Sequence, residues 1–200
     1  MNTQFVIAGV HQRGYASDPE NTYHYLMSCR SGHVNDHALA SMLVSQMACN
    51  CDLPDNLGLS VVDFREMMAF YFPYATWPVC DDAGYGESHD SGEEEKQLLF
   101  DLLWSHRVDS SKARRWIAVI VAAGCMGSDH LWQDMGLPCR ADLSTLLRAN
   151  FPLLVQKNIH DMKWKRFFYR QLCEQRGFTV CRSPNCEACV DYNMCFGEDD

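Results

Sequence analysis

Four cysteines near the carboxyl end of the chain have the residue type and spacing to bind a metal centre. They lie within fifteen positions at the spacing C-x4-C-x2-C-x5-C, at Cys181, Cys186, Cys189 and Cys195. Thiolates are soft, anionic ligands that select zinc, copper(I) or an iron–sulfur cluster. The first three cysteines have the C-x4-C-x2-C order of plant-type ferredoxins, whereas a zinc ribbon needs two C-x2-C pairs. The spacing favours an iron–sulfur cluster, with a compact zinc knuckle or disulfides as the alternatives.

Three segments of the chain, taken in order, resemble one protein family. They are Asp129–Asp134 (DHLWQD), Met162–Cys173 (MKWKRFFYRQLC) and the four-cysteine tail that ends at Cys195-Phe196-Gly197. From about residue 93 to the end, the chain resembles NifQ, the molybdenum carrier of nitrogenase cofactor assembly. Residues 1–92 carry none of these signatures.

The resemblance to NifQ implies a cofactor, a function and partners. The cofactor would be an iron–sulfur cluster that contains molybdenum, bound by the four tail cysteines. The protein would donate this metal for the biosynthesis of the iron–molybdenum cofactor of nitrogenase. Its implied partners are the nitrogenase cofactor scaffold complex, the nitrogenase iron protein and iron–sulfur assembly proteins.

Two other functions stay open on the residues alone. One is a protein-interaction module stabilised by a zinc knuckle, although the tail has no histidine to complete such a site. The other is an iron–sulfur electron carrier, which the cysteine spacing does not separate from a molybdenum donor. The sequence contains no P-loop, Gly-rich dinucleotide turn or nucleophile elbow, so we expect a carrier rather than an enzyme.

Two further residues are candidate ligands for a molybdenum that must be released. His130 lies in the segment from Gly127 to Trp132, which glycines loosen, and a neutral imidazole binds a metal without adding charge. Cys173 follows Arg170 by three residues on an expected helix, where a cationic neighbour lowers the pKa of a thiol. The simpler alternatives are that His130 caps a helix and that Cys173 packs in the core.

Composition sets the outer limits of these interpretations. The 200-residue chain is 47% apolar and 12% aromatic, which is typical of one globular domain with a substantial core. No apolar run approaches the roughly 18 residues that cross a bilayer, so we expect a cytoplasmic protein with no membrane association. Disulfides are rare in a reducing compartment, and the eleven cysteines therefore point to metal binding.

The charge distribution is uneven. The formal net charge of −9 argues against a nucleic-acid partner, because phosphates need a basic surface. Residues 156–182 are an exception, with seven Lys or Arg and two acids. A basic segment ahead of four thiolates would offset their negative charge, and a solvated helix face is the simpler alternative.

Apolar periodicity and capping residues predict an all-α fold, with a cluster-binding loop at residues 178–200. The apolar stretch 119–121 also suits a buried strand, but no partner strand is evident. Residues 1–92 form a variable helical region that ends in a flexible acidic connector over residues 72–92, and residues 93–200 form the family-like helical core. Seven helices are expected: 19–29, 34–47, 61–71, one following Ser91 through Leu103, 111–125, 142–150 and 159–175.

Overall fold

The computed structural model describes residues 18–80, 91–175 and Asn193. All the regular structure within these residues is helical, which confirms the predicted all-α class. The proposed cluster loop at 178–200 lies outside the described residues, apart from Asn193. The elements in chain order are α1 (Pro19–Ser28), α2 (Asp36–Met47), the 3-10 helix η1 (Asp55–Gly58), α3 (Val61–Tyr71), α4 (Ser91–Ser105), α5 (Lys112–Gly124), α6 (Leu131–Asp134), α7 (Arg140–Asn150), α8 (Pro152–Val155) and α9 (Trp164–Gln175).

Local sequence signals explain where three of the helices begin. The side chains of Asp18, Ser60 and Ser111 each accept a hydrogen bond from a backbone N–H in the first turn of α1, α3 and α5. Such caps satisfy donors that have no partner within the helix. The strand alternative for residues 119–121 is wrong, because these residues lie inside α5.

Two predicted boundaries around α8 and α9 are wrong. Pro152 was expected only to end a helix, but it also begins α8, since the first helical position needs no N–H donor. The last helix begins at Trp164 rather than Ile159. Asn158 explains the delay: its Oδ1 accepts from Met162 N at 2.9 Å, and its Nδ2 donates to Met162 O at 2.8 Å. These bonds close a loop in place of a helical turn.

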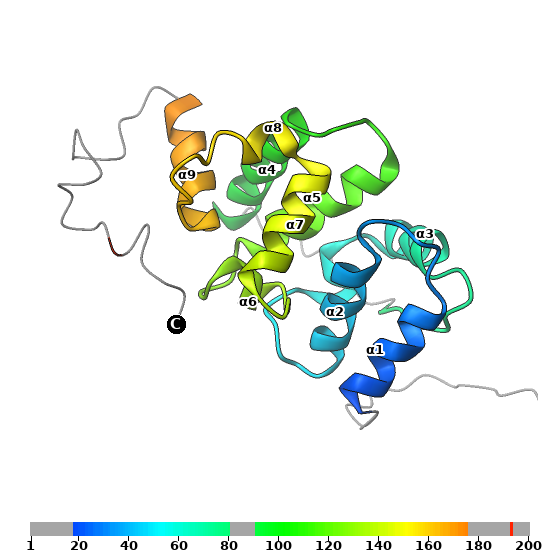
Figure 1. The fold of residues 1–200 in the computed structure, drawn as a ribbon. Coiled ribbons are helices and arrows are strands. Elements are labelled where there is room, and N and C mark those ends of the chain that lie inside the picture. The colour runs from blue at the N-terminus through cyan, green and yellow to red at the C-terminus, as the bar shows by residue number, and fades with distance from the viewer. Residues whose placement is uncertain (1–17, 81–90, 176–192, 194–200) are drawn as a thin grey trace, which may run out of the picture.

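The core joins the two halves of the described chain. Buried side chains on both sides of residues 81–90, among them Phe64, Leu99 and Phe168, belong to one apolar cluster. Helix α4 packs against α5 and α9, and Figure 1 shows α1 to α3 at one end of the molecule and α9 at the other, with α5 and α7 between them.

The first part of the expected flexible connector belongs to this core. Phe72 is buried, and Trp77 and Val79 pack against the apolar cluster. The side chain of Asn56 holds Cys80 through both its backbone groups, at 2.9 and 3.1 Å. The prediction of a solvated connector is therefore wrong for residues 72–80, and residues 81–90 lie outside the described part of the chain.

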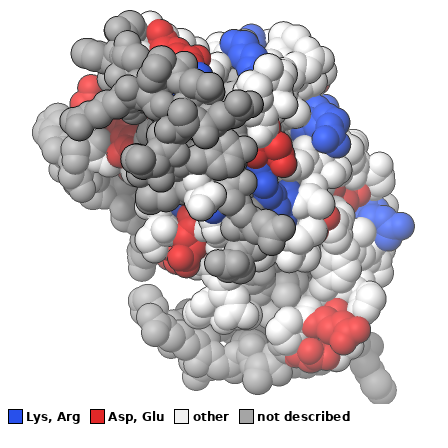
Figure 2. Space-filling model, turned by 60° about the vertical axis from the view of Figure 1, so that its left-hand side comes forward, with Lys and Arg blue, Asp and Glu red and all other residues white. Residues whose placement is uncertain are grey.

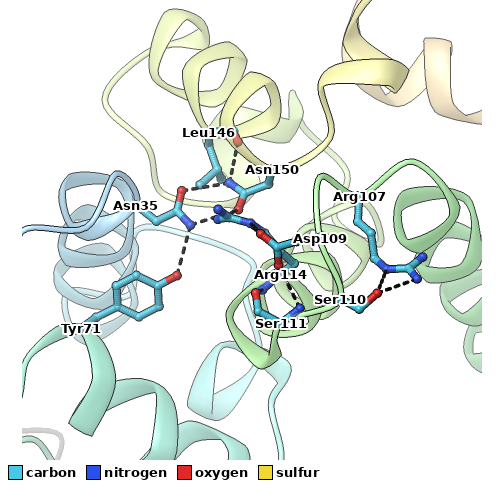
Figure 3. Close-up of polar contacts among 9 residues, drawn as sticks. All are labelled: Asn35, Tyr71, Arg107, Asp109, Ser110, Ser111, Arg114, Leu146 and Asn150. Carbon is cyan, nitrogen blue, oxygen red and sulfur yellow. Dashed lines mark hydrogen bonds and ion pairs between the residues drawn. The ribbon is translucent and has the colours of Figure 1, made fainter.

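A polar network centred on two buried asparagines connects the helices to one another (Figure 3). Asn35 and Asn150 exchange two amide hydrogen bonds, at 3.1 and 2.9 Å. Asn35 also donates to the hydroxyl of Tyr71 at 3.1 Å, and Arg114 donates to Asn150 Oδ1 at 2.7 Å. These bonds connect the start of α2 with α3, α5 and α7.

Among the described residues, no helix is long and apolar enough to span a membrane.

Candidate functional site

A pocket of about 580 Å³ lies where three parts of the chain meet. One wall is the segment from Gly127 to Trp132, the second is α7 with Arg140 and Leu143, and the third is the start of α9 from Lys163 to Arg166. This volume lies in the range of small-molecule binding sites. The pocket also brings together two of the three segments that carry the family resemblance, which are distant in the sequence.

The first wall is a tight turn that leads into α6. His130 is the residue before the helix, and its backbone N–H donates to Gln133 Oε1 at 3.2 Å. The N–H of Asp129 donates to Asp134 Oδ1 at 3.1 Å. A Cβ at position 127 would lie 2.5 Å from Asp134 Cγ, so only glycine fits against this carboxylate. Contacts with the Asp134 side chain therefore determine the conformation of this turn.

A buried ion pair fastens this turn to α9. Lys165 donates to Asp134 Oδ2 and, at 2.8 Å, to the carbonyl oxygen of Gly127. The Asp134 side chain is 1% exposed and that of Lys165 is 16% exposed. Burial raises the pKa of Asp134 above its usual value, and the hydrogen bond from Lys165 opposes this rise. The pair thus holds two walls of the pocket together.

Sequence reasoning missed the Lys165–Asp134 pair. It treated Lys165, with Lys163, Arg166 and Arg170, only as part of the basic segment over residues 156–182. The structure places Lys163 and Arg166 at the pocket, whereas Arg170 lines a separate depression and pairs with Glu174 at 2.8 Å. The available signal was an aspartate at the end of a short helix that begins with Leu131 and Trp132, because a carboxylate buried beside apolar residues needs a partner.

The pocket has an excess of basic side chains. Arg140 donates to Asp161 Oδ1 at 3.0 Å and to the carbonyl oxygens of Asp161 and Met162, at 2.8 and 3.3 Å. Lys163 and Arg166 also line the pocket, and Asp129 is the one acidic residue among its described lining residues. Figure 2 turns the α9 side of the molecule forward and shows Lys and Arg at separate places with Asp and Glu between them. The visible part of this face therefore carries no continuous basic patch.

Two titratable groups, the buried Cys125 and the partly buried Tyr169, also line the pocket, and both are neutral at pH 7. Burial raises the pKa of the Cys125 thiol to about 12. Burial and a hydrogen bond with Glu95 raise the pKa of the Tyr169 hydroxyl. A thiol with so high a pKa is a poor metal ligand, because the thiolate is the form that binds. Cys125 is therefore a packed core thiol, whereas the tail cysteines are expected to bind a metal centre.

The structure separates the predicted ligands. His130 lines the pocket, whereas Cys173 is half-buried on α9 and is not a lining residue. The four tail cysteines Cys181, Cys186, Cys189 and Cys195 lie outside the described residues. Within residues 18–80 and 91–175, no three His, Cys, Asp or Glu side chains are grouped to hold a metal ion.

The described fold and pocket define an all-helical protein with a basic, small-molecule-sized pocket. Comparison with known sequences identifies the family: the family model described as NifQ matches residues 38–197. The chain belongs to the NifQ family. The match begins well before residue 93, where the family resemblance was expected to start, and so includes α2, η1 and α3.

Individual relatives agree with this assignment. Protein NifQ of Azotobacter vinelandii is 41% identical over 155 residues, which cover 72% of this chain and 79% of the relative. Protein NifQ of Rhodobacter capsulatus is 35% identical over 147 residues, 74% of this chain and 79% of the relative. Protein NifQ of Klebsiella pneumoniae is 48% identical over 113 residues, which cover 55% of this chain and 65% of the relative. No solved structure matches the chain. Family membership implies a role in nitrogen fixation and molybdenum processing.

Proposed function

We propose that the chain is an iron–sulfur protein that carries molybdenum, as a Mo–Fe–S cluster, and donates it for the biosynthesis of the nitrogenase iron–molybdenum cofactor. The observation that carries this proposal is a four-thiol donor set in a member of the NifQ family. Thiolates are the ligands that iron–sulfur clusters take from proteins. The absence of a competing donor group in residues 18–80 and 91–175 directs the proposal to the tail.

Cys181, Cys186, Cys189 and Cys195 would hold the cluster, and the cluster would supply sulfide-bridged sites for molybdenum. The metal leaves with the donation step, so the protein acts as a carrier rather than an enzyme. His130 and Cys173 are the candidates for a weaker ligand to molybdenum. Of the two, His130 lies at the basic pocket, where a ligand would be surrounded by Arg140, Lys163 and Arg166.

The proposal also names a location and partners. The protein would act in the cytoplasm, where reducing conditions keep cysteine thiols available for metals. It would receive its cluster from iron–sulfur assembly proteins. It would pass molybdenum to the nitrogenase cofactor scaffold complex and the nitrogenase iron protein. The alternatives are a zinc-knuckle interaction module and an iron–sulfur electron carrier, and both are outcomes of the experiment below.

Metal analysis of oxygen-free protein tests the proposal. Iron, acid-labile sulfide, molybdenum and zinc are measured together in the parent, in Cys186→Ser and in a matched control, Cys139→Ser. Cys139 is an exposed thiol outside the tail whose Sγ contacts Asp142. We expect Cys186→Ser to lose its iron and sulfide while its far-UV helicity stays near the parental value, because the helices share a separate apolar core. Cys139→Ser should keep its iron.

Each other outcome has a definite meaning. Full iron content in Cys186→Ser would remove that residue from the ligand set. Zinc without iron in the parent would favour the interaction module, and iron without molybdenum that can be released would favour the electron carrier. The same measurement on His130→Ala and Cys173→Ala gives the molybdenum-to-iron ratio, which should fall in the variant that lacks the weaker ligand.

A further inference from the structure

We propose that the basic pocket is a binding site for a divalent tetrahedral oxyanion, separate from the thiolate site of the tail. Arg140, Lys163, Lys165 and Arg166 line it, and they come from two helices and the residue that precedes α9. All four residues belong to the described part of the chain. The choice of molybdate as the first probe rests on the proposed function, but the site itself does not.

Among the described residues, four cations line the pocket, together with one acidic residue, Asp129. Asp134 neutralises Lys165 from beneath, and Asp161 pairs with Arg140 from an exposed position, its side chain being 79% exposed. Arg166 is exposed and makes no hydrogen bond or ion pair with another described residue. Lysine and arginine donors beside a cavity give charge-assisted hydrogen bonds to oxyanions.

The ion pairs also organise the site. Lys165 fixes the turn at Gly127, and Arg140 holds the Asp161 and Met162 carbonyls that precede α9. Both cations are therefore held in position before a ligand arrives. A pre-positioned set of donors loses less side-chain entropy on binding than a set of unrestrained surface lysines.

The apolar part of the lining strengthens the electrostatic attraction. Leu131, Leu143 and Trp164 stand beside the basic groups, and low-dielectric walls increase the interaction between charges. Trp132 also lines the pocket, and its Nε1–H is buried with no acceptor among the described residues. A buried donor without a partner has a free-energy cost that a ligand oxygen or a water molecule would remove.

The chemistry of the pocket selects the class of ligand. A metal cation is disfavoured by the basic lining, and a nucleic acid by the net charge of −9. A tetrahedral oxyanion occupies the volume of only a few water molecules, each about 30 Å³. The pocket of about 580 Å³ therefore admits such an ion together with bound water. Phosphate, sulfate and molybdate share this chemistry and are separated by the test.

Equilibrium dialysis provides the test. Molybdate binding is measured on full-length protein in which Cys181, Cys186, Cys189 and Cys195 are replaced by serine, so that no tail thiolate contributes. Sulfate binding is measured on the unaltered chain, since thiolates do not ligate sulfate, and phosphate is added as a competitor. Arg166→Glu is compared with Arg148→Glu, a matched change at another exposed arginine that is not among the described lining residues of the pocket.

We expect saturable binding of about one oxyanion per chain, weakened about tenfold or more by Arg166→Glu, which is the scale of a lost charged hydrogen bond. Arg148→Glu should stay within about twofold of the parent. Equal weakening by both variants, or no saturable binding of any of the three oxyanions, would overturn the proposal. If sulfate binds as tightly as molybdate, the pocket is an oxyanion site, but it has no specific role in molybdenum transport.

The two proposals fail in different ways. Loss of iron in Cys186→Ser with unchanged oxyanion binding locates the cluster in the tail and leaves the pocket intact. Parental iron content in Arg166→Glu, together with weakened oxyanion binding, shows that the pocket is independent of the cluster. If the parent holds no iron at all but binds an oxyanion saturably, the carrier proposal fails and the pocket proposal stands.

Discussion

Two polar clusters join distant helices in this protein, and they differ in how completely their groups are satisfied. In the first, Asn35 and Asn150 are 1% and 0% exposed, and their amides bond to each other, to Tyr71 and to Arg114. In the second, Asp134 and Lys165 form an ion pair at the edge of a pocket lined by further cations. The amides of the first cluster bond to each other, whereas Arg166 beside the second makes no hydrogen bond or ion pair with another described residue.

This difference separates a structural network from a binding site. Reciprocal amide bonds between neutral groups are independent of pH and leave nothing for a ligand to complete. A buried charge pair is a costly way to connect two helices, and well-packed apolar residues often do so as well. The Asp134–Lys165 pair lies where two segments that resemble the family meet. A ligand bound by the surrounding cations would explain why a charged pair is found there.

The largest effect on stability should come from breaking the charged cluster. Asp134→Ala leaves the Lys165 ammonium without its carboxylate and the N–H of Asp129 without its acceptor. Removing one partner of a buried pair typically lowers the free energy of unfolding by about 3 to 5 kcal/mol. Urea denaturation at pH 7 measures this loss.

Asp161→Asn is the matched control, because asparagine tolerates the left-handed backbone at this position (φ 52°) and the exposed pair with Arg140 should be worth less than about 1 kcal/mol. A similar loss in both variants would show that burial of Asp134 has no special cost or benefit. The pH dependence gives a second check. Burial raises the pKa of Asp134 in the folded state, so its titration contributes stability that is full below the unfolded-state pKa of about 3.9 and is lost as pH rises through the folded-state pKa. The difference between parent and Asp134→Ala should therefore be larger near pH 4 than near pH 7.

A somewhat smaller loss is expected in the neutral cluster. Asn150→Ala removes the partner of Asn35 and Arg114 and leaves the carbonyl of Leu146 without a side-chain donor. Leaving buried groups unsatisfied should lower the free energy of unfolding by about 2 kcal/mol, with no effect on oxyanion binding. Asn21→Ala, at an exposed amide that bonds only Asp18, should cost within about 0.5 kcal/mol. Loss of oxyanion binding in Asn150→Ala would erase the distinction between the two clusters.

The smallest effect tests the fit of the pocket turn. An alanine Cβ at position 127 would press against the Asp134 carboxylate, so Gly127→Ala should lower the free energy of unfolding by about 1 to 2 kcal/mol and weaken oxyanion binding. Gly92→Ala is the control, because its Cβ would meet only the Met126 side-chain end at 3.8 Å in a helix that favours alanine. Thermal unfolding of both variants measures the difference. An unchanged Gly127→Ala protein would mean that the turn relaxes away from Asp134.

Local residue chemistry was enough to place most helices. Capping side chains such as Ser60 and Ser111 act within a few residues, so their effect can be inferred without knowing the rest of the fold. The thiol chemistry of the tail and the family resemblance could likewise be inferred from the residue types and their order. The start of α9 was harder to place, because Asn158 bonds to the backbone of Met162, four residues away, and these bonds compete with a helical turn.

Contacts between distant segments were decided only by the tertiary structure. Residues 72–80 have the composition of a loop, but Phe72 and Trp77 pack on the apolar core once the helices are assembled. Lys165 and Asp134 are 31 positions apart, and no sequence pattern predicts that they pair. Helical periodicity predicts which side chains share a face, but it carries no information about which distant face lies opposite. The residue types of the tail thus determined what chemistry to expect, whereas the pocket exists only because packing α9 against the rest of the fold brings its first turn to the segment before α6.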